Sequence, residues 1–192
     1  MIRQAVPGDA PKAVPLILEA IGSIAFILTG TTERKEAASV LDGFFRQEGN
    51  RVSYQNTLVL QSDGQVVGVA LLYDGAKARE LDVPLERAAA KNSGLPDYRI
   101  PTEPDESEFY LDTVSVSPSC RGKGYGRKLI EAACLRAREQ EHRRIALLVD
   151  LDNADAKRLY ERLGFSVDYT KSIGGEDNCF LVAAASVFFF GR

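Results

Sequence analysis

The chain has 192 residues, of which 45% are apolar and 27% charged, with a net charge of −3. This composition is typical of one soluble globular domain with a sizeable core, and the absence of a basic stripe argues against a nucleic-acid partner. Three cysteines without C-x-x-C spacing and a single histidine exclude a disulfide framework, a zinc site and a histidine triad. No metal site is expected.

The N-terminal region gives no sign of export or membrane insertion. Met1–Ala10 carries Arg3 and Asp9 and is not followed by an apolar segment with a cleavage site. Pro15–Thr29 is apolar, but Glu19 interrupts it and it is too short to span a bilayer. We therefore expect a cytoplasmic protein with no membrane partner.

The first half of the chain predicts alternating strands and helices. Hydrophobic periodicity predicts the following elements: a strand at Ile2–Val6, helices at Ala10–Ser23 and Thr32–Gln47, strands at Thr57–Gln61 and Gln65–Tyr73, and a helix at Ala78–Lys91. The two longer strands form a hairpin, because Ser62-Asp63-Gly64 supplies the positive φ values of a tight turn. The charged segment 74–107, with its proline and glycine breakers, is interpreted as a lid or insert within a single domain of residues 1–192.

A strand, a glycine-rich loop and a helix start follow one another in the centre of the chain. Phe109–Val116 is aromatic and β-branched and ends at Ser117-Pro118, and a helical pattern runs over Arg127–Glu141. Between them, alternating glycines let backbone N–H groups approach a ligand, and the helix start adds unpaired donors and a favourable dipole. The combination predicts a cradle for phosphate or pyrophosphate. The alternative is a glycine-rich turn without a ligand.

Two common phosphate motifs do not fit this loop. A Walker loop needs Ser or Thr after Gly122-Lys123, and the dinucleotide fingerprint needs glycine where Arg127 stands. The pattern Arg-x-x-Gly-x-Gly does fit, as Arg121, Gly124 and Gly126. Here the sequence resembles the GNAT superfamily of N-acetyltransferases, in which this motif binds the pyrophosphate of acetyl-coenzyme A.

The chain after the loop supports the same resemblance. Arg144–Leu151 is a continuous apolar strand, which we expect to lie parallel to Phe109–Val116 through a right-handed crossover. Asn153–Phe165 reads as a capped helix and matches the family pattern Asn-x-x-Ala-x-x-x-Tyr-x-x-x-Gly-Phe. Two last strands, Ser166–Thr170 and Asn178–Ala184, flank a turn at Gly174-Gly175.

The resemblance implies an α/β fold with a mixed, largely antiparallel sheet flanked by helices. It implies acetyl-coenzyme A as acyl donor and transfer of the acetyl group to a primary amine of a small molecule or protein. The residues that it assigns to the coenzyme are Val114, Ser115, Val116, Arg121, Gly122, Lys123, Gly124, Tyr125, Gly126, Arg127, Asn153 and Tyr160.

The resemblance also assigns Tyr160 as the acid that protonates the leaving thiolate, with packing on the helix seam as the alternative. Asp112 is expected to alternate onto the strand face of Tyr110, Val114 and Val116, where it would take a proton or orient a cationic substrate. The alternative is a carboxylate that is merely satisfied at a strand position near the end of the sheet. A non-catalytic acyl-coenzyme A sensor, or an interaction module that uses Phe188-Phe189-Phe190, is the rival interpretation. The sequence is also compatible with a homodimer.

Two polar stretches have two interpretations each. Glu103, Asp105, Glu106 and Glu108 precede Asp112 and would attract a cationic acceptor such as a polyamine, a basic amino acid or a protein amino group, if they border the cleft. Otherwise they form a solvated acidic loop. The polar residues from Arg51 to Asn56 face the same cleft or, as we prefer, serve ordinary loop chemistry.

Overall fold

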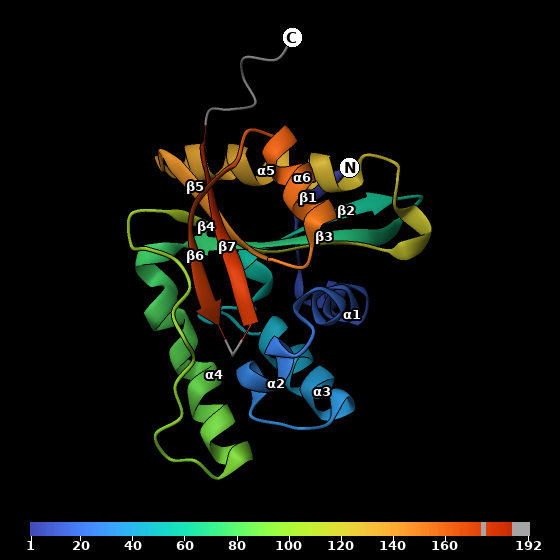
Figure 1. Cartoon of the computed structure of the whole chain (residues 1–192). Coiled ribbons are helices and arrows are strands. Elements are labelled where there is room, and N and C mark those ends of the chain that lie inside the picture. The colour runs from blue at the N-terminus through green and yellow to red at the C-terminus, as the bar shows by residue number, and fades with distance from the viewer. Residues whose placement is uncertain (174–175, 186–192) are drawn as a thin grey trace.

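The computed structural model describes residues 1–173 and 176–185. Within these residues one sheet of seven strands runs in the order β1-β2-β3-β4-β5-β7-β6, with helices on both faces (Figure 1). The strands are β1 (Ile2–Gln4), β2 (Thr57–Ser62), β3 (Gln65–Asp74), β4 (Phe109–Val116), β5 (Arg144–Asp150), β6 (Ser166–Ile173) and β7 (Glu176–Ala184). Strands β4 and β5 are parallel and the other neighbouring pairs are antiparallel. The predicted mixed, largely antiparallel sheet is confirmed.

The helices separate into two layers. They are α1 (Ala10–Ile21), α2 (Ile24–Thr29), α3 (Arg34–Phe45), α4 (Ala78–Ser93), α5 (Tyr125–Glu139) and α6 (Ala154–Arg162), with short 3-10 turns at Pro7–Asp9, Tyr54–Asn56, Gly75–Lys77 and Pro118–Cys120. In Figure 1, α5 and α6 lie above the sheet and α1, α2 and α3 lie below it. Apolar side chains of α5, such as Leu129 and Ile130, form one core with the upper face, and those of α1 and α3, such as Ile17 and Leu41, form another with the lower face.

The sheet opens between its two parallel strands. Only Phe109 with Ile145 and Tyr110 with Ala146 are paired in register between β4 and β5, at the start of each strand in the described structure. Beyond these pairs the strands diverge, although β5 stays paired with β7 over its whole length. The opening leaves backbone groups of β4 without a strand partner on that side, which is where a ligand can bind them.

The segment 74–107 contributes α4 and an irregular stretch that returns to the sheet. Helix α4 packs closely against the end of α2: a Cβ added to Gly30 would lie 2.3 Å from the carbonyl oxygen of Ala89. Gly30 also has a φ of +64°, so glycine is required there for two reasons.

Two details differ from the sequence-based expectations, and two predicted features fall outside the described residues. Helix α2 was not expected, and α5 begins at Tyr125 rather than Arg127 because Gly124 takes the left-handed conformation at its N-cap. The Gly174-Gly175 turn and the Phe188-Phe189-Phe190 segment lie outside the described residues.

Candidate active site

A cavity of about 540 Å³ lies where β4 and β5 diverge. Its walls come from the α1–α2 junction, β4, β5, β7 and α6, and Arg51 and Glu103 close one side. Its lining includes the polar and apolar residues Glu19, Arg51, Glu103, Asp112, Val114, Asp150, Asn153 and Tyr160. The cavity thus brings together Asp112, Val114, Asn153 and Tyr160, which the sequence had assigned to the site from separate motifs.

The glycine-rich loop has the geometry of an anion cradle. Gly122 and Gly124 have φ values of +77° and +74°, and Gly124 is the N-cap of α5. No atom of the described chain lies within 4 Å of a Cβ built at Gly122, Gly124 or Gly126, so the space above the loop is open. The first-turn N–H groups of the 15-residue helix α5 point out of its N-terminus by helix geometry. An anion can therefore approach the backbone here from solvent.

Basic side chains surround the cradle. Arg121 donates from Nε to the carbonyl oxygen of Val116 at 3.2 Å and pairs through Nη2 with Glu19 at 2.7 Å. Because Glu19 lines the cavity, this pair connects the loop with the cavity wall. The Lys128 ammonium lies 5.7 Å from the ring centre of Tyr125, at the helix start. Lys123 is exposed on the loop.

Tyr160 reaches the cavity from α6. Asn153, one of the two caps that the sequence allowed beside Asp152, accepts the N–H of Ala156 at 3.1 Å, and Gly164 follows the end of the helix with a φ of +90°. The Tyr160 ring packs on Phe165 with 5.7 Å between centroids, so the side chain belongs to the helix seam and lines the cavity at once. Burial raises the pKa of Tyr160 to about 12, and the phenol is therefore protonated at neutral pH.

Asp112 shares a face of β4 with Tyr110, as predicted, but not with Val114 and Val116. The register between β3 and β4 shifts between Leu71 and Leu72, which leaves Asp112 as the unpaired residue of a β-bulge. Val114 and Val116 pack against the core under α5, whereas Asp112 accepts from Tyr73 on the lower face. The expectation that Asp112 shares a face with Val114 and Val116 is wrong, because strict alternation fails at a bulge.

The Asp112 carboxylate is bound by several donors. Oδ2 accepts from Arg51 Nε at 2.6 Å and from the Tyr73 hydroxyl at 3.0 Å, and Oδ1 accepts from Thr113 Oγ1 at 2.8 Å. A carboxylate that accepts from three donors is held in position. It is placed to orient a cation that enters the cavity.

Arg51 is the site residue that sequence reasoning missed. Its side chain is only 3% exposed, lines the cavity, and contacts Asp82, Glu103 and Asp112. The preferred interpretation of the Arg51–Asn56 stretch as ordinary loop chemistry is therefore wrong for Arg51. The sequence offered one signal for this role, a polar residue just before a predicted strand. The acidic partners of Arg51 could not be predicted, because they come from three other segments of the chain.

The acidic run before β4 does not act as a unit. Glu103 is buried and lines the cavity, where its carboxylate binds Arg51 and the Tyr110 hydroxyl. Glu108 is also buried, but it pairs with Arg144 at 3.0 Å and is absent from the cavity lining. Asp105 and Glu106 are exposed. Glu103 therefore borders the cavity, Asp105 and Glu106 fit the solvated loop, and Glu108 fits neither interpretation.

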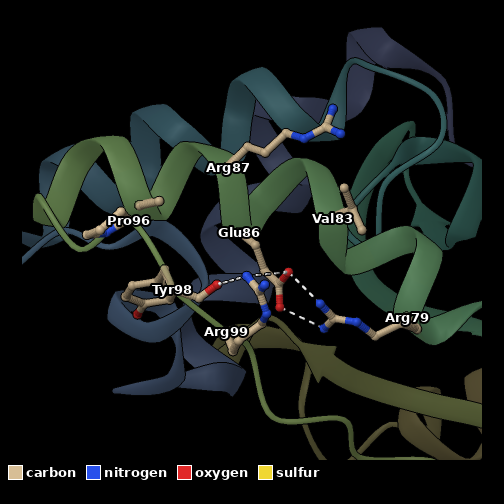
Figure 2. Close-up of a pocket in the computed structure, with 8 residues that line it drawn as sticks. Arg79, Val83, Glu86, Arg87, Pro96, Tyr98 and Arg99 are labelled. Atoms are coloured by element: carbon tan, nitrogen blue, oxygen red, sulfur yellow. Dashed lines mark hydrogen bonds and ion pairs between the residues drawn. The ribbon is translucent and has the colours of Figure 1, made fainter.

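A second cavity, of about 410 Å³, lies along α4 and the stretch after it (Figure 2). At its centre, buried Glu86 accepts two bonds of 2.7 Å from Arg79 and one of 2.9 Å from the N–H of Ile100, and Arg99 lies 3.9 Å away. Arg87 points away from this carboxylate in Figure 2. Glu86 thus fastens the stretch that leads from Ile100 to Glu103, and this cavity shares no lining residue with the first one.

Other kinds of site find no support in the described chain. No group of three or more His, Cys, Asp or Glu side chains there is arranged to hold a metal ion. None of the described helices is both long enough and apolar enough to cross a membrane.

The open parallel pair, the glycine-rich helix start and the cavity between them belong to a fold that solved acetyltransferases share. Residues 27–165 match the Acetyltransferase (GNAT) family, and the chain belongs to this family. A solved structure described as an acetyltransferase is 30% identical, with a TM-score of 0.78 over 96% of this chain and 99% of that one. An N-acetyltransferase from Staphylococcus aureus Mu50 is 21% identical, with the same TM-score over 95% of this chain and 100% of that one, which supports the fold.

Sequence relatives match over shorter regions. The 5-NmdU N-acetyltransferase of Pseudomonas phage PaMx11 is 41% identical over 69 residues, which are 36% of this chain and 46% of that protein. The mycothiol acetyltransferase of Actinosynnema mirum is 39% identical over 62 residues, 32% of this chain and 21% of that protein. The matched region thus spans less than half the length of each relative.

Proposed function

We propose that the protein transfers an acetyl group from acetyl-coenzyme A to a primary amine by direct attack. The observation that carries this proposal is the cavity of about 540 Å³, in which Tyr160, Asn153 and Val114 meet a carboxylate-lined wall next to the anion cradle. The cradle suits the donor, the opening between β4 and β5 suits its extended arm, and the acidic wall suits an amine. These features converge at one place in the fold.

The donor would be held mainly by backbone groups. The first-turn N–H groups of α5 and the open space above Gly122, Gly124 and Gly126 fit a pyrophosphate, with Arg121, Lys123, Tyr125 and Arg127 around it. Val114, Ser115 and Val116 follow the bulge of β4, where the strand has left β5, and their free edge can bind the pantetheine amides. Asn153 and Tyr160 close the end near the thioester.

The reaction forms an N–C bond to the thioester carbonyl and breaks the C–S bond. The amine attacks in its neutral form, and its extra proton leaves to water in the open cavity. A backbone N–H of β4 near Val114 would stabilise the negative charge that develops on the carbonyl oxygen. The leaving sulfur accepts a proton from the Tyr160 hydroxyl, which burial keeps protonated. The tyrosinate then regains a proton from water, so that overall one proton passes from the amine to the thiol.

Of the two functional roles predicted for Asp112, we assign it the second, which is to orient a positively charged acceptor. Its bonds from Arg51, Tyr73 and Thr113 fix the carboxylate at the cavity wall, where such a group can meet it. Together with Glu103 and Asp150 it gives the cavity wall a negative field, which would attract cationic amines at low salt.

The test measures thiol release from acetyl-coenzyme A with a panel of primary amines, and acetyl-coenzyme A affinity by calorimetry. We expect amine-dependent release in the parent protein. In Gly124→Val, the β-branched residue opposes the φ of +74° and enters the open space, so affinity should fall at least tenfold. Tight binding without release for any amine would instead favour the acyl-coenzyme A sensor.

A further inference from the structure

A buried group of charges forms one wall of the acceptor cavity. We define the Arg51 cluster as Arg51, Asp82, Glu103 and Asp112, whose side chains are 3%, 2%, 8% and 5% exposed. The guanidinium lies 2.6 Å from Asp112 and 3.6 Å from Asp82, and it also binds Glu103. Carboxylates buried this deeply need compensating positive charge, and here they share a single guanidinium among the described residues.

Asp82 shows that this compensation is incomplete. Its Oδ1 atom is buried and has no hydrogen-bond partner in the part of the chain that the structure describes. Burial is the main cause that raises the pKa of Asp82 to about 6. Arg51 lowers this pKa, whereas the nearby charges of Asp112, Glu103 and Glu86 raise it further. Three buried carboxylates therefore share the charge of one guanidinium in the described structure.

The cavity gives a ligand access to the cluster. Arg51, Glu103 and Asp112 all line it. The nearby ammonium of Lys171 does not fill the deficit directly, because it binds the backbone carbonyl oxygens of Thr102 and Glu103 at 2.9 and 3.1 Å. A positive group that enters the cavity can reach Glu103 and Asp112.

We propose that the acceptor carries a second positive group besides the amine that is acetylated, and that this group binds at Glu103 and Asp112. The inference rests on the proposed function and narrows its acceptor to diamines and other amines with a distant ammonium or guanidinium group. Glu103 then determines specificity: it contacts the acceptor's second charge but not the reacting atoms. Charge-assisted hydrogen bonds of this kind strengthen when water is excluded.

The first test compares substrates of equal length with the parent protein. Cadaverine is paired with aminopentanol, and putrescine with aminobutanol, so that only the distant ammonium is replaced by a hydroxyl. We expect kcat/KM to favour the diamine at least tenfold, mainly through KM. Equal values for both members of each pair overturn the second-charge site but leave the acetyltransferase proposal intact.

The second test removes the proposed charge partner. Glu103→Gln should abolish the preference for diamines, while Glu106→Gln, which removes an exposed carboxylate three residues away, should preserve it. A thermal shift provides a readout without turnover: cadaverine should raise the melting temperature of the parent and of Glu106→Gln more than aminopentanol does. If neither the parent's kinetics nor its melting temperature distinguishes the two compounds, the proposal is wrong even if Glu103→Gln fails to fold. Absence of turnover with every amine, with the thermal shift retained, contradicts the proposed function alone.

Discussion

At the scale of single residues, the same burial that places Tyr160 in the cavity also sets its chemistry. A phenol with a pKa of about 12 keeps its proton throughout the neutral range, and it is a weaker acid than an ordinary thiol. It should therefore act by hydrogen bonding to the sulfur as negative charge develops, with proton transfer late in the reaction. The position on the seam of α6, which had suggested mere packing, is compatible with this role.

Replacing Tyr160 tests that role. Tyr160→Phe retains the ring contact with Phe165 and removes the proton donor, so turnover should fall about 10²–10⁴-fold with unchanged acetyl-coenzyme A affinity. Steady-state kinetics measured from about pH 6 to about pH 10 would check this expectation. A variant as active as the parent at every pH would reduce Tyr160 to a packing residue.

Asp82 links the Arg51 cluster to the pH dependence of stability. Its pKa of about 6 in the folded state exceeds the unfolded value of about 3.9, so the folded protein retains a proton that the unfolded chain has lost. This group therefore makes the free energy of unfolding fall as pH rises from about 4 to about 6. In Asp82→Asn that contribution disappears, and urea unfolding across this pH range should show a shallower decline. A decline as steep as in the parent would mean that other carboxylates cause it.

At the scale of elements, the sequence predicted those parts of the fold that local patterns determine. Strand β4 has the predicted bounds, Phe109–Val116, because β-branched and aromatic residues run up to a proline. The hairpin at Asp63 and the start and stop of α6 were also predicted, because turns and caps depend on nearby residues. The alternating glycines before a helix start predicted the cradle, and the resemblance added its expected ligand.

The missing parts depend on contacts between distant segments. A bulge in β4 leaves no trace in the alternation of residues, so the face of Asp112 was misjudged. Arg51 became a site residue only through partners 31 to 61 positions away, which no local pattern reports. Helix α2 has six residues, too few to show a helical period.

The contact between α2 and α4 gives a prediction at this scale. Gly30→Ala places a Cβ 2.3 Å from the Ala89 carbonyl oxygen and also opposes a φ of +64°. The free energy of unfolding should therefore fall by more than the φ effect alone, by about 2–4 kcal/mol in total. Gly94→Ala is the matched control, since its φ is +75° but no described atom lies within 4 Å of its Cβ. Urea unfolding of both variants should place Gly30→Ala well below Gly94→Ala. Equal losses would show that α4 can move away without cost.

At the scale of the whole molecule, the sheet consists of two halves that meet at one short contact. Strands β1 to β4 form one half and β5, β7 and β6 the other, and within the described structure only the pairs at Phe109 and Tyr110 join them. The candidate donor site spans this junction, because its residues come from β4 and α5 on one side and from α6, which follows β5, on the other. A donor bound there would connect the halves through its own contacts.

Hydrogen exchange can test whether the donor links the two halves. Acetyl-coenzyme A should slow exchange of backbone amides in β4 from Val114 to Val116, and in the part of β5 from Leu147 to Val149 that faces the opening, because these amides lack a β4–β5 partner in the free protein. The hairpin of β2 and β3, already paired along its length, should change little. In Gly124→Val the same addition should leave exchange as it was, since the cradle no longer holds the pyrophosphate. Protection confined to the glycine loop, with none in β4 or β5, would place the arm of the donor outside the opening and would separate the cradle from the proposed centre of acetyl transfer.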